Sequence, residues 1–172
     1  MAHRMTSRSR LPASASRLAT VLFVLAIPVF LVTTNVRFLA TEVRFYEEGF
    51  RRHDSDVATG IELAELDRAA RQVVEYFSND ADTLRIVVIE DGDEVSLFDA
   101  RETQHMQDVK GLMGAVYRLN EVSLAIILVY VGAVVLWARE RSGRDLARQA
   151  LLGVGVGIAA VAFVGVFAVT GF

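Results

Sequence analysis

Three long apolar runs divide the chain and confine its charged residues to the segments between them. Residues 18–36, 122–138 and 150–172 contain no Asp, Glu, Lys or Arg. A helix rises about 1.5 Å per residue, so each run is close to the length needed to cross the roughly 30 Å apolar core of a bilayer. The pattern predicts a membrane protein, mainly α-helical, with three transmembrane helices.

The first apolar run has two interpretations. Arg4, Arg8, Arg10 and Arg17 precede it, as basic residues precede the apolar core of a cleaved signal peptide. The run is longer than such a core, however, and the residues VRFLAT after it offer no small-x-small cleavage site. We therefore expect residues 18–36 to remain as a transmembrane anchor.

The arginines predict how the three spans are oriented. Residues 1–17 and the short loop 139–149 each carry four arginines, and short loops rich in Lys and Arg stay on the cytoplasmic side. Residues 41–121 hold 19 acidic against 9 basic residues. We therefore expect residues 37–121 to be extracytoplasmic.

Residues 37–121 carry the signs of a small α+β segment between the first two spans. Apolar side chains at helical period predict an amphipathic helix over residues 62–78. Residues 85–98 read as two strands that flank an Asp-Gly turn, which is a hairpin signal. Residues 101–120 again follow the helical period, and this helix either extends the second span or lies along the membrane interface.

The third apolar run contains two glycines four residues apart, Gly153 and Gly157. This spacing is typical of membrane helices that approach another helix closely. Small residues are also frequent in membrane helices in general, so both interpretations stay open. The first interpretation predicts helix–helix association through Gly153 and Gly157.

Composition excludes several classes of protein and site. The chain has no cysteine and 53% hydrophobic residues, which excludes a disulfide scaffold, thiolate metal sites and a disordered chain. The acidic balance of the central segment argues against nucleic-acid binding. Isolated histidines among scattered acids are a poor metal-ligand set, and the chain has neither a P-loop nor a G-x-S-x-G serine motif. We therefore expect neither a metal nor a cofactor.

His105 is the best candidate for chemistry among the three histidines. Glu102 and Asp108 lie three residues to either side, so both carboxylates can share its helix face. A carboxylate partner raises the basicity of an imidazole, which suits a general base, but the same spacing also describes an ordinary surface salt bridge. His53 lies in a polar loop, where we expect it to be solvated. Lys110, the only lysine, could bind an anionic headgroup or an ester oxygen, or be solvated.

The residues around His105 resemble the signature of a family of bacterial integral membrane proteins, that of the lipoprotein intramolecular transacylase (Lit). The resemblance rests on a polar run ahead of a membrane span, made of Arg101, Glu102, His105, Met106, Asp108, Val109 and Lys110. Upstream, YEEGF and TGIELAELDRAARQVVEYF are similar to the family's Tyr-rich segment and its helix. In layout the resemblance covers residues 15–172.

The resemblance implies an acyltransferase. The family's reaction moves the sn-2 acyl chain of a diacylglyceryl-cysteine lipoprotein to the α-amino group of the same cysteine, without nucleotide or metal. It implies that His105 is the acid and base, oriented by Asp108, with Arg101 or Lys110 as the cation for the oxyanion and Glu102 as a further site residue. The implied partners are membrane lipid and a diacylated lipoprotein, and the implied location is the bacterial plasma membrane.

The chain departs from the family pattern at its end. Family members usually continue past the third span into a second outer loop with another histidine and then a fourth span, whereas this sequence ends at Phe172. We expect either a fragment or a member that lacks this half. The rival hypothesis is a non-catalytic integral membrane protein whose acidic outer segment binds a partner.

Overall fold

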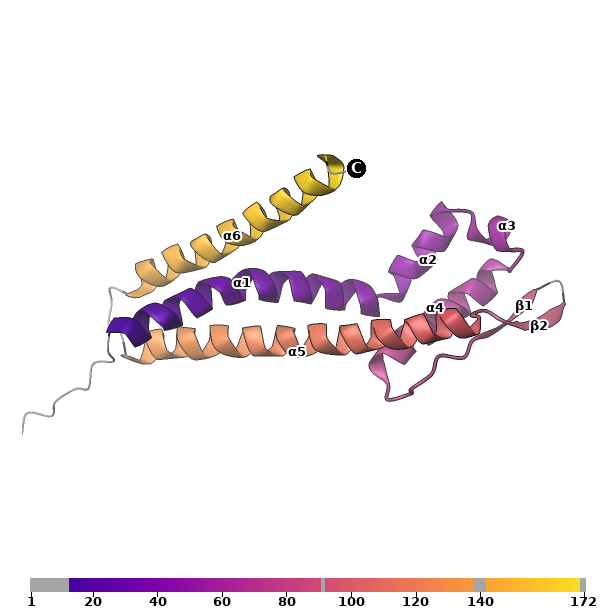
Figure 1. Cartoon of the computed structure of the whole chain (residues 1–172), viewed down its shortest axis with the longest axis horizontal. Helices are drawn as coiled ribbons and strands as arrows, with labels where there is room; N and C mark the ends of the chain where they lie inside the picture. The colour runs from indigo at the N-terminus through magenta and orange to yellow at the C-terminus, as the bar shows by residue number, and fades with distance from the viewer. Residues whose placement is uncertain (1–12, 91, 138–141, 171–172) are drawn as a thin grey trace, which may run out of the picture. The chain divides into compact units, whose positions relative to one another are not determined.

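Helices make up most of the computed structural model, which describes residues 13–90, 92–137 and 142–170 (Figure 1). Three of the helices are long and apolar enough to cross a membrane: α1 (Ala13–Thr41), α5 (Ala100–Trp137) and α6 (Ser142–Thr170). The expectation of a mainly helical fold with three potential spans is confirmed. The chain forms two compact units, one of residues up to 31 with those from 121 onward, the other of residues 32–120.

α5 and α6 both extend beyond the apolar runs that predict them. The expected helix 101–120 and the expected span 122–138 are parts of the single helix α5, so the first extends the second. α6 begins at Ser142, and most of the expected loop 139–149 is therefore helical. Arg, Leu, Ala and Gln are good helix formers, so the polar residues there continue the helix beyond its apolar run. Residues 138–141 lie outside the described residues.

In the first unit, α6 approaches α1 closely at two glycines. A side-chain carbon added at Gly153 would lie 2.8 Å from the backbone oxygen of Val24, and one added at Gly157 would lie 3.0 Å from the Cβ of Pro28. Residues without a side chain let two helix backbones come this near. The two glycines therefore face a helix of their own chain.

A tyrosine makes polar contacts with two helices of the first unit. Tyr130 of α5 places its Oη 3.0 Å from the Oγ1 of Thr20 in α1 and donates to the Oε1 of Gln149 in α6 at 2.8 Å. Its ring stacks on that of Phe23, with the centroids 4.4 Å apart. Polar groups on membrane helices need partners inside the protein because the bilayer core offers no water. Tyr130 thus links all three long helices.

The second unit is a small α+β arrangement. Besides parts of α1 and α5 it contains α2 (Val43–Arg52), α3 (Ser55–Thr59), α4 (Leu63–Ser78), β1 (Val87–Glu90) and β2 (Asp93–Ser96). The two strands pair antiparallel as a hairpin, and Gly92 adopts a φ of 92° at its turn, a backbone conformation that glycine tolerates best. α4 and the hairpin lie within the expected ranges 62–78 and 85–98. The side of the membrane on which this unit lies stays a prediction.

An apolar cluster between α4 and the hairpin forms the core of the second unit. Met106 of α5 packs against it. Side chains alternate along β1 as strand geometry requires, because Val88 is 0% exposed while Val87 and Ile89 are exposed. The buried members are Ile61, Leu66, Ala69, Tyr76, Leu84, Ile86 and Val88.

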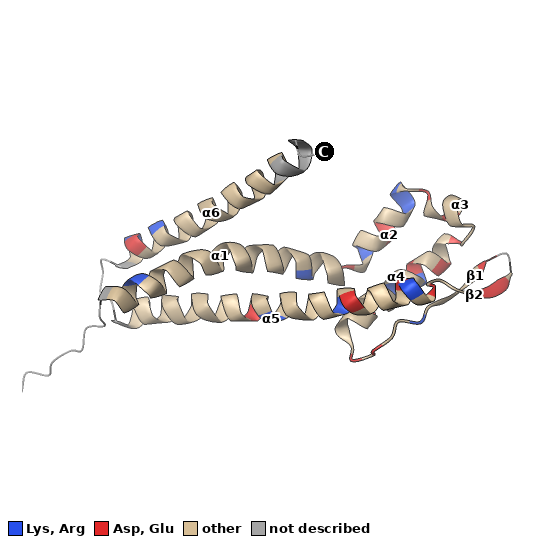
Figure 2. Ribbon diagram, in the orientation of Figure 1, with Lys and Arg blue, Asp and Glu red and all other residues tan. Residues whose placement is uncertain are grey.

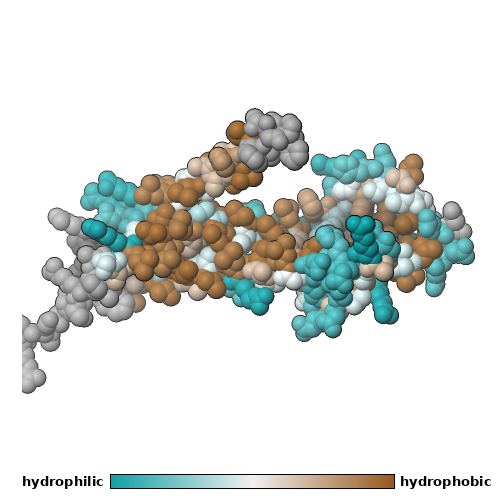
Figure 3. All heavy atoms as spheres, in the orientation of Figure 1, coloured by the Kyte–Doolittle hydropathy of each residue, from teal (hydrophilic) through white to brown (hydrophobic). Residues whose placement is uncertain are grey.

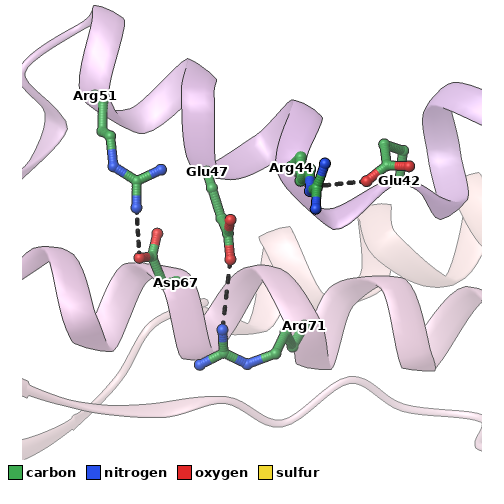
Figure 4. A network of polar contacts seen from close by, with 6 residues as sticks. All are labelled: Glu42, Arg44, Glu47, Arg51, Asp67 and Arg71. Carbon is green, nitrogen blue, oxygen red and sulfur yellow. Dashed lines mark hydrogen bonds and ion pairs between the residues drawn. The ribbon is translucent and has the colours of Figure 1, made fainter.

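Charged residues gather on this second unit and are sparse along most of the three long helices (Figure 2). Hydrophobic residues dominate the visible surface of the long helices (Figure 3). Two ion pairs join α2 to α4 (Figure 4): Arg51 to Asp67 at 2.8 Å and Glu47 to Arg71 at 3.4 Å. Phe50, between the two α2 residues, packs against the core. α2 was missed at the sequence level because it has only ten residues, five of them charged.

We expect Arg51→Ala to lower the free energy of unfolding of the second unit by about 1 kcal/mol. The Asp67 side chain is only 20% exposed, so its carboxylate would lose its cation while remaining partly desolvated. The loss is measured by denaturant unfolding in detergent, with hydrogen exchange of the α2 and α4 amides as the probe. Arg52→Ala is the matched control, because Arg52 pairs with Glu48 on the exposed face of α2, and its loss of stability should be clearly smaller. Equal losses in the two variants would contradict the prediction.

Candidate functional site

A reciprocal pair of hydrogen bonds fixes the start of α5, the helix that carries His105. The backbone N–H of Glu102 donates to the Oδ1 of Asp99 at 2.7 Å, and the backbone N–H of Asp99 donates to the Oε2 of Glu102 at 2.9 Å. This is a capping box, in which two carboxylates satisfy donors at a helix N-terminus where negative charge is favoured. Glu102 therefore has a local structural role, which the spacing of Asp99 and Glu102 indicates and which was missed at the sequence level.

His105 lies on the next turn of α5 with its side chain exposed. It lines a shallow, open depression together with Asp99, Arg101 and Glu102. Within the described part of the chain, the side chains of His105 and Arg101 make no hydrogen bond or ion pair. The structure thus brings three of the five predicted site residues to one solvent-open surface.

Asp108 lies outside this depression. It is exposed, and among the described residues its carboxylate is not hydrogen-bonded to His105. The two residues are three positions apart on one helix, which keeps the carboxylate close enough to orient the imidazole through a change of rotamer. The pairing predicted from spacing stays a prediction.

Lys110 points away from the depression and toward the end of α4. Its Nζ donates to the backbone oxygen of Ala81 at 2.7 Å and to the Oδ1 of Asn79 at 3.2 Å. The same Nζ lies 4.1 Å from the centroid of the Tyr76 ring, a cation–π contact. Gln107, one turn earlier, donates to Thr83 at 3.1 Å. Lys110 and Gln107 together fasten the loop 79–83 to α5.

Replacing Lys110 by methionine should loosen that loop. The amide N–H of Ala81 donates to the same Asn79 Oδ1 at 2.9 Å, so it reports on the local structure that Lys110 holds. Loss of the charge-assisted bonds is expected to cost about 1–1.5 kcal/mol, which speeds exchange of this amide roughly five- to tenfold. Hydrogen exchange measures the rate, and Lys110→Arg should keep most of the protection. Unchanged exchange in the methionine variant would contradict the assignment.

A second set of polar contacts joins α1 and α5 within the second unit. The Nδ2 of Asn120 donates to the Oγ1 atoms of Thr33 and Thr34 at 3.0 and 2.8 Å. The guanidinium of Arg37 lies 4.9 Å from the centroid of the Tyr117 ring. Arg37 thus contacts an aromatic ring of its own chain.

Burial raises the pKa of Tyr46 on α2, and the nearby Tyr117 raises it further. The hydroxyl of Tyr46 therefore lies in a partly desolvated environment. The proximity of Tyr46 and Tyr117 could not be predicted from local spacing, because 70 residues separate them in the sequence. Among the described residues, no group of three or more His, Asp or Glu side chains could hold a metal ion.

Comparison with known proteins identifies a family for the chain. Residues 21–172 match the family model described as lipoprotein intramolecular transacylase Lit. No curated protein and no solved structure matches the chain. The matched range includes both units, with the exposed His105 and the capped start of α5. The chain therefore belongs to the lipoprotein intramolecular transacylase family.

Proposed function

We propose that this protein is a membrane acyltransferase that moves the sn-2 acyl chain of a diacylglyceryl-cysteine lipoprotein to the α-amino group of the same cysteine. The observation that carries the proposal is the family match over residues 21–172, which includes the run from Arg101 to Lys110. Three helices able to cross a membrane suit a substrate that is itself held in the bilayer.

The reaction balances without a co-reactant. The amine nitrogen attacks the ester carbonyl, a C–N bond forms, and the C–O bond to the glycerol oxygen breaks. One proton leaves the nitrogen and one is returned to the glycerol oxygen. An α-amine has an ordinary pKa near 8 and an imidazole near 6.5, so a histidine can carry this proton at neutral pH. Because both reacting groups belong to one molecule, holding it in a reactive conformation supplies much of the rate.

The geometry supports His105 as the proton carrier and Arg101 as the cation for the oxyanion. Both line the same open depression at the capped start of α5, so both are accessible to a substrate. A guanidinium offers several donors to a developing oxyanion. Lys110 fits this role less well because two protein oxygens and the Tyr76 ring already contact its Nζ. We assign Lys110 to positioning and Asp108 to orienting the imidazole.

The position of His105 on α5 sets how far the substrate ester must lie from the apolar run of that helix. His105 precedes Val122, the first residue of the apolar run, by 17 positions, which is about 25 Å along a helix axis. The lipid-bearing cysteine must therefore rise from the bilayer surface, or α5 must tilt, for the ester to reach His105. We place the second unit on the extracytoplasmic side because the arginine-rich segments flank the opposite ends of the spans.

The test is mass spectrometry of a reporter lipoprotein. The chain is expressed beside a diacylated reporter in a bacterial host that lacks N-acylation, and the N-terminal lipopeptide is isolated. We expect an unchanged total mass, with one acyl chain moved from glycerol to the amine only when the chain is present. A reporter that keeps both chains on glycerol, although the protein is inserted in the membrane, would contradict the proposal.

A further inference from the structure

Exposed aromatic side chains flank the point at which α1 ends and α2 begins. Phe38, in the last turn of α1, is 61% exposed, and Phe45, in the first turn of α2, is 57% exposed. Leu39 beside them is 43% exposed. Burying large aromatic side chains is strongly favourable, so their exposure at one junction needs an explanation.

The junction between α1 and α2 is short and is fixed by a hydrogen bond. α1 ends at Thr41 and α2 begins at Val43, after the single N-cap residue Glu42. The Oη of Tyr46 donates to the backbone oxygen of Ala40 at 3.3 Å, which ties α2 back to the last turn of α1. Because the candidate membrane span on α1 reaches Thr41, the start of α2 lies where that span ends.

α2 has an inner face that is occupied and an outer face that is not. The inner face is bound to α4 through Glu47 and Arg51 (Figure 4). On the outer face, Glu48 and Arg52 pair with each other at 2.8 Å. That leaves an exposed arginine, Arg44, beside Phe45, and among the described residues the Arg44 guanidinium makes no ion pair.

We infer that the start of α2 is an anchor in the headgroup layer of the bilayer, with Phe38 and Phe45 at the boundary with the acyl chains and Arg44 on a lipid phosphate. Aromatic rings concentrate at this depth in membrane proteins, and arginine stems extend along apolar surface to reach phosphates. The lipid-facing surface of α1 is continuous with Phe38, so the occupant is the lipid that already surrounds this helix. The inference does not depend on acyl transfer.

The anchor would fix one edge of the second unit at the membrane surface. α2 is bound to α4, and α4 is bound through the loop 79–83 to Lys110 of α5. A lipid contact at Phe45 is therefore transmitted through side-chain contacts to the helix that carries His105. An amphipathic helix held in this way limits how far its unit can lift from the surface.

Single-tryptophan probes with brominated lipids test the anchor. The full chain carries one tryptophan, Trp137, which is first replaced by phenylalanine. Tryptophan is then placed at Phe45, at Val57 of α3, or at Leu128 in the middle of the α5 span. Val57 is 81% and Leu128 61% exposed, so neither substitution disturbs a core. The proteins are reconstituted in phosphatidylcholine vesicles brominated at shallow or deep acyl positions.

We expect shallow bromines to quench the probe at position 45 at least twofold more than deep ones, deep bromines to quench the probe at 128 most, and neither to quench the probe at 57. A position-45 probe that behaves like the position-57 probe would overturn the anchor. Should Phe45→Trp alter the helical circular dichroism, Phe38→Trp gives an independent reading with the same expected depth. Arg44→Gln should move the position-45 profile outward and Arg44→Lys should not; an unmoved profile in Arg44→Gln would overturn the phosphate contact.

Discussion

Replacing His105 by alanine is expected to lower the rate of acyl migration by about 10²–10⁴-fold, the usual contribution of a positioned general acid–base group. The side chain is exposed on a capped helix, so its removal takes away the proton carrier without opening a cavity. The protein should insert and fold as before. A time course of the reporter lipopeptide by mass spectrometry gives the rate, and circular dichroism gives the helix content.

His53→Ala is the matched control for this prediction. His53 is also exposed, and its contribution to structure is a backbone N–H that donates to the oxygen of Gly49 at 3.2 Å, which alanine keeps. Its migration rate should equal that of the unmodified chain. Glu102→Gln should also stay active, because glutamine can complete the capping box. A His105→Ala protein that transfers acyl chains as fast as His53→Ala would remove His105 from the mechanism.

Tyr76→Ala is expected to destabilise the second unit by about 3–5 kcal/mol, as truncation of a large buried aromatic residue does. The side chain is 2% exposed, its Oη donates to the backbone oxygen of Asp82 at 3.2 Å, and its ring carries the Lys110 ammonium. One substitution therefore removes core packing, a hydrogen bond and a cation–π contact. The loss is comparable to the whole stability of a small unit, so we expect α4 and β1 to lose most of their hydrogen-exchange protection.

Tyr76→Phe separates these contributions. It keeps the ring and the cation–π contact and removes only the hydrogen bond to Asp82, which should cost about 1 kcal/mol. Denaturant unfolding in detergent compares the two variants. Equal losses in Tyr76→Ala and Tyr76→Phe would show that the hydroxyl, and not the packing of the ring, stabilises the unit.

The raised pKa of Tyr76 leads us to expect a loss of stability at alkaline pH. Burial, and then the charge of Asp82, raise the pKa of Tyr76 above its ordinary value of 10.0. As pH rises through 10.0, Tyr76 ionises in the unfolded chain while it stays protonated in the folded one. Deprotonation therefore stabilises the unfolded state and lowers the free energy of unfolding. Stability should therefore fall above pH 10, and Tyr76→Phe should remove this part of the fall.

Local sequence patterns predicted two kinds of helix: those with a continuous apolar run long enough to cross a membrane, and the one with an apolar stripe along one face. The charge-free runs predicted the three long helices, since no soluble packing explains such runs, and the period of residues 62–78 predicted α4. α2 escaped prediction although its partly buried Val43, Tyr46 and Phe50 follow the helical period. The helix has only ten residues, five of them charged, and this is shorter than the window over which a helical period is read.

The candidate site divides in the same way. The motif around His105 was readable as a family resemblance, and the family match over residues 21–172 bears that resemblance out. The role of Lys110 was not readable, because it depends on partners distant in sequence: Asn79 and Ala81 lie about 30 residues away. The capping box of Asp99 and Glu102, by contrast, has a local sequence signature that was missed.

By itself, then, the sequence determined that this is a membrane protein with three potential spans and which motif its second long helix carries. Hydrophobic length and local spacing suffice for that, because the bilayer and the helix impose fixed dimensions. Only the tertiary structure decided that Gly153 and Gly157 face α1 and that Lys110 fastens a loop. Those facts depend on which side chains meet across the fold, and spacing along one helix does not contain that information.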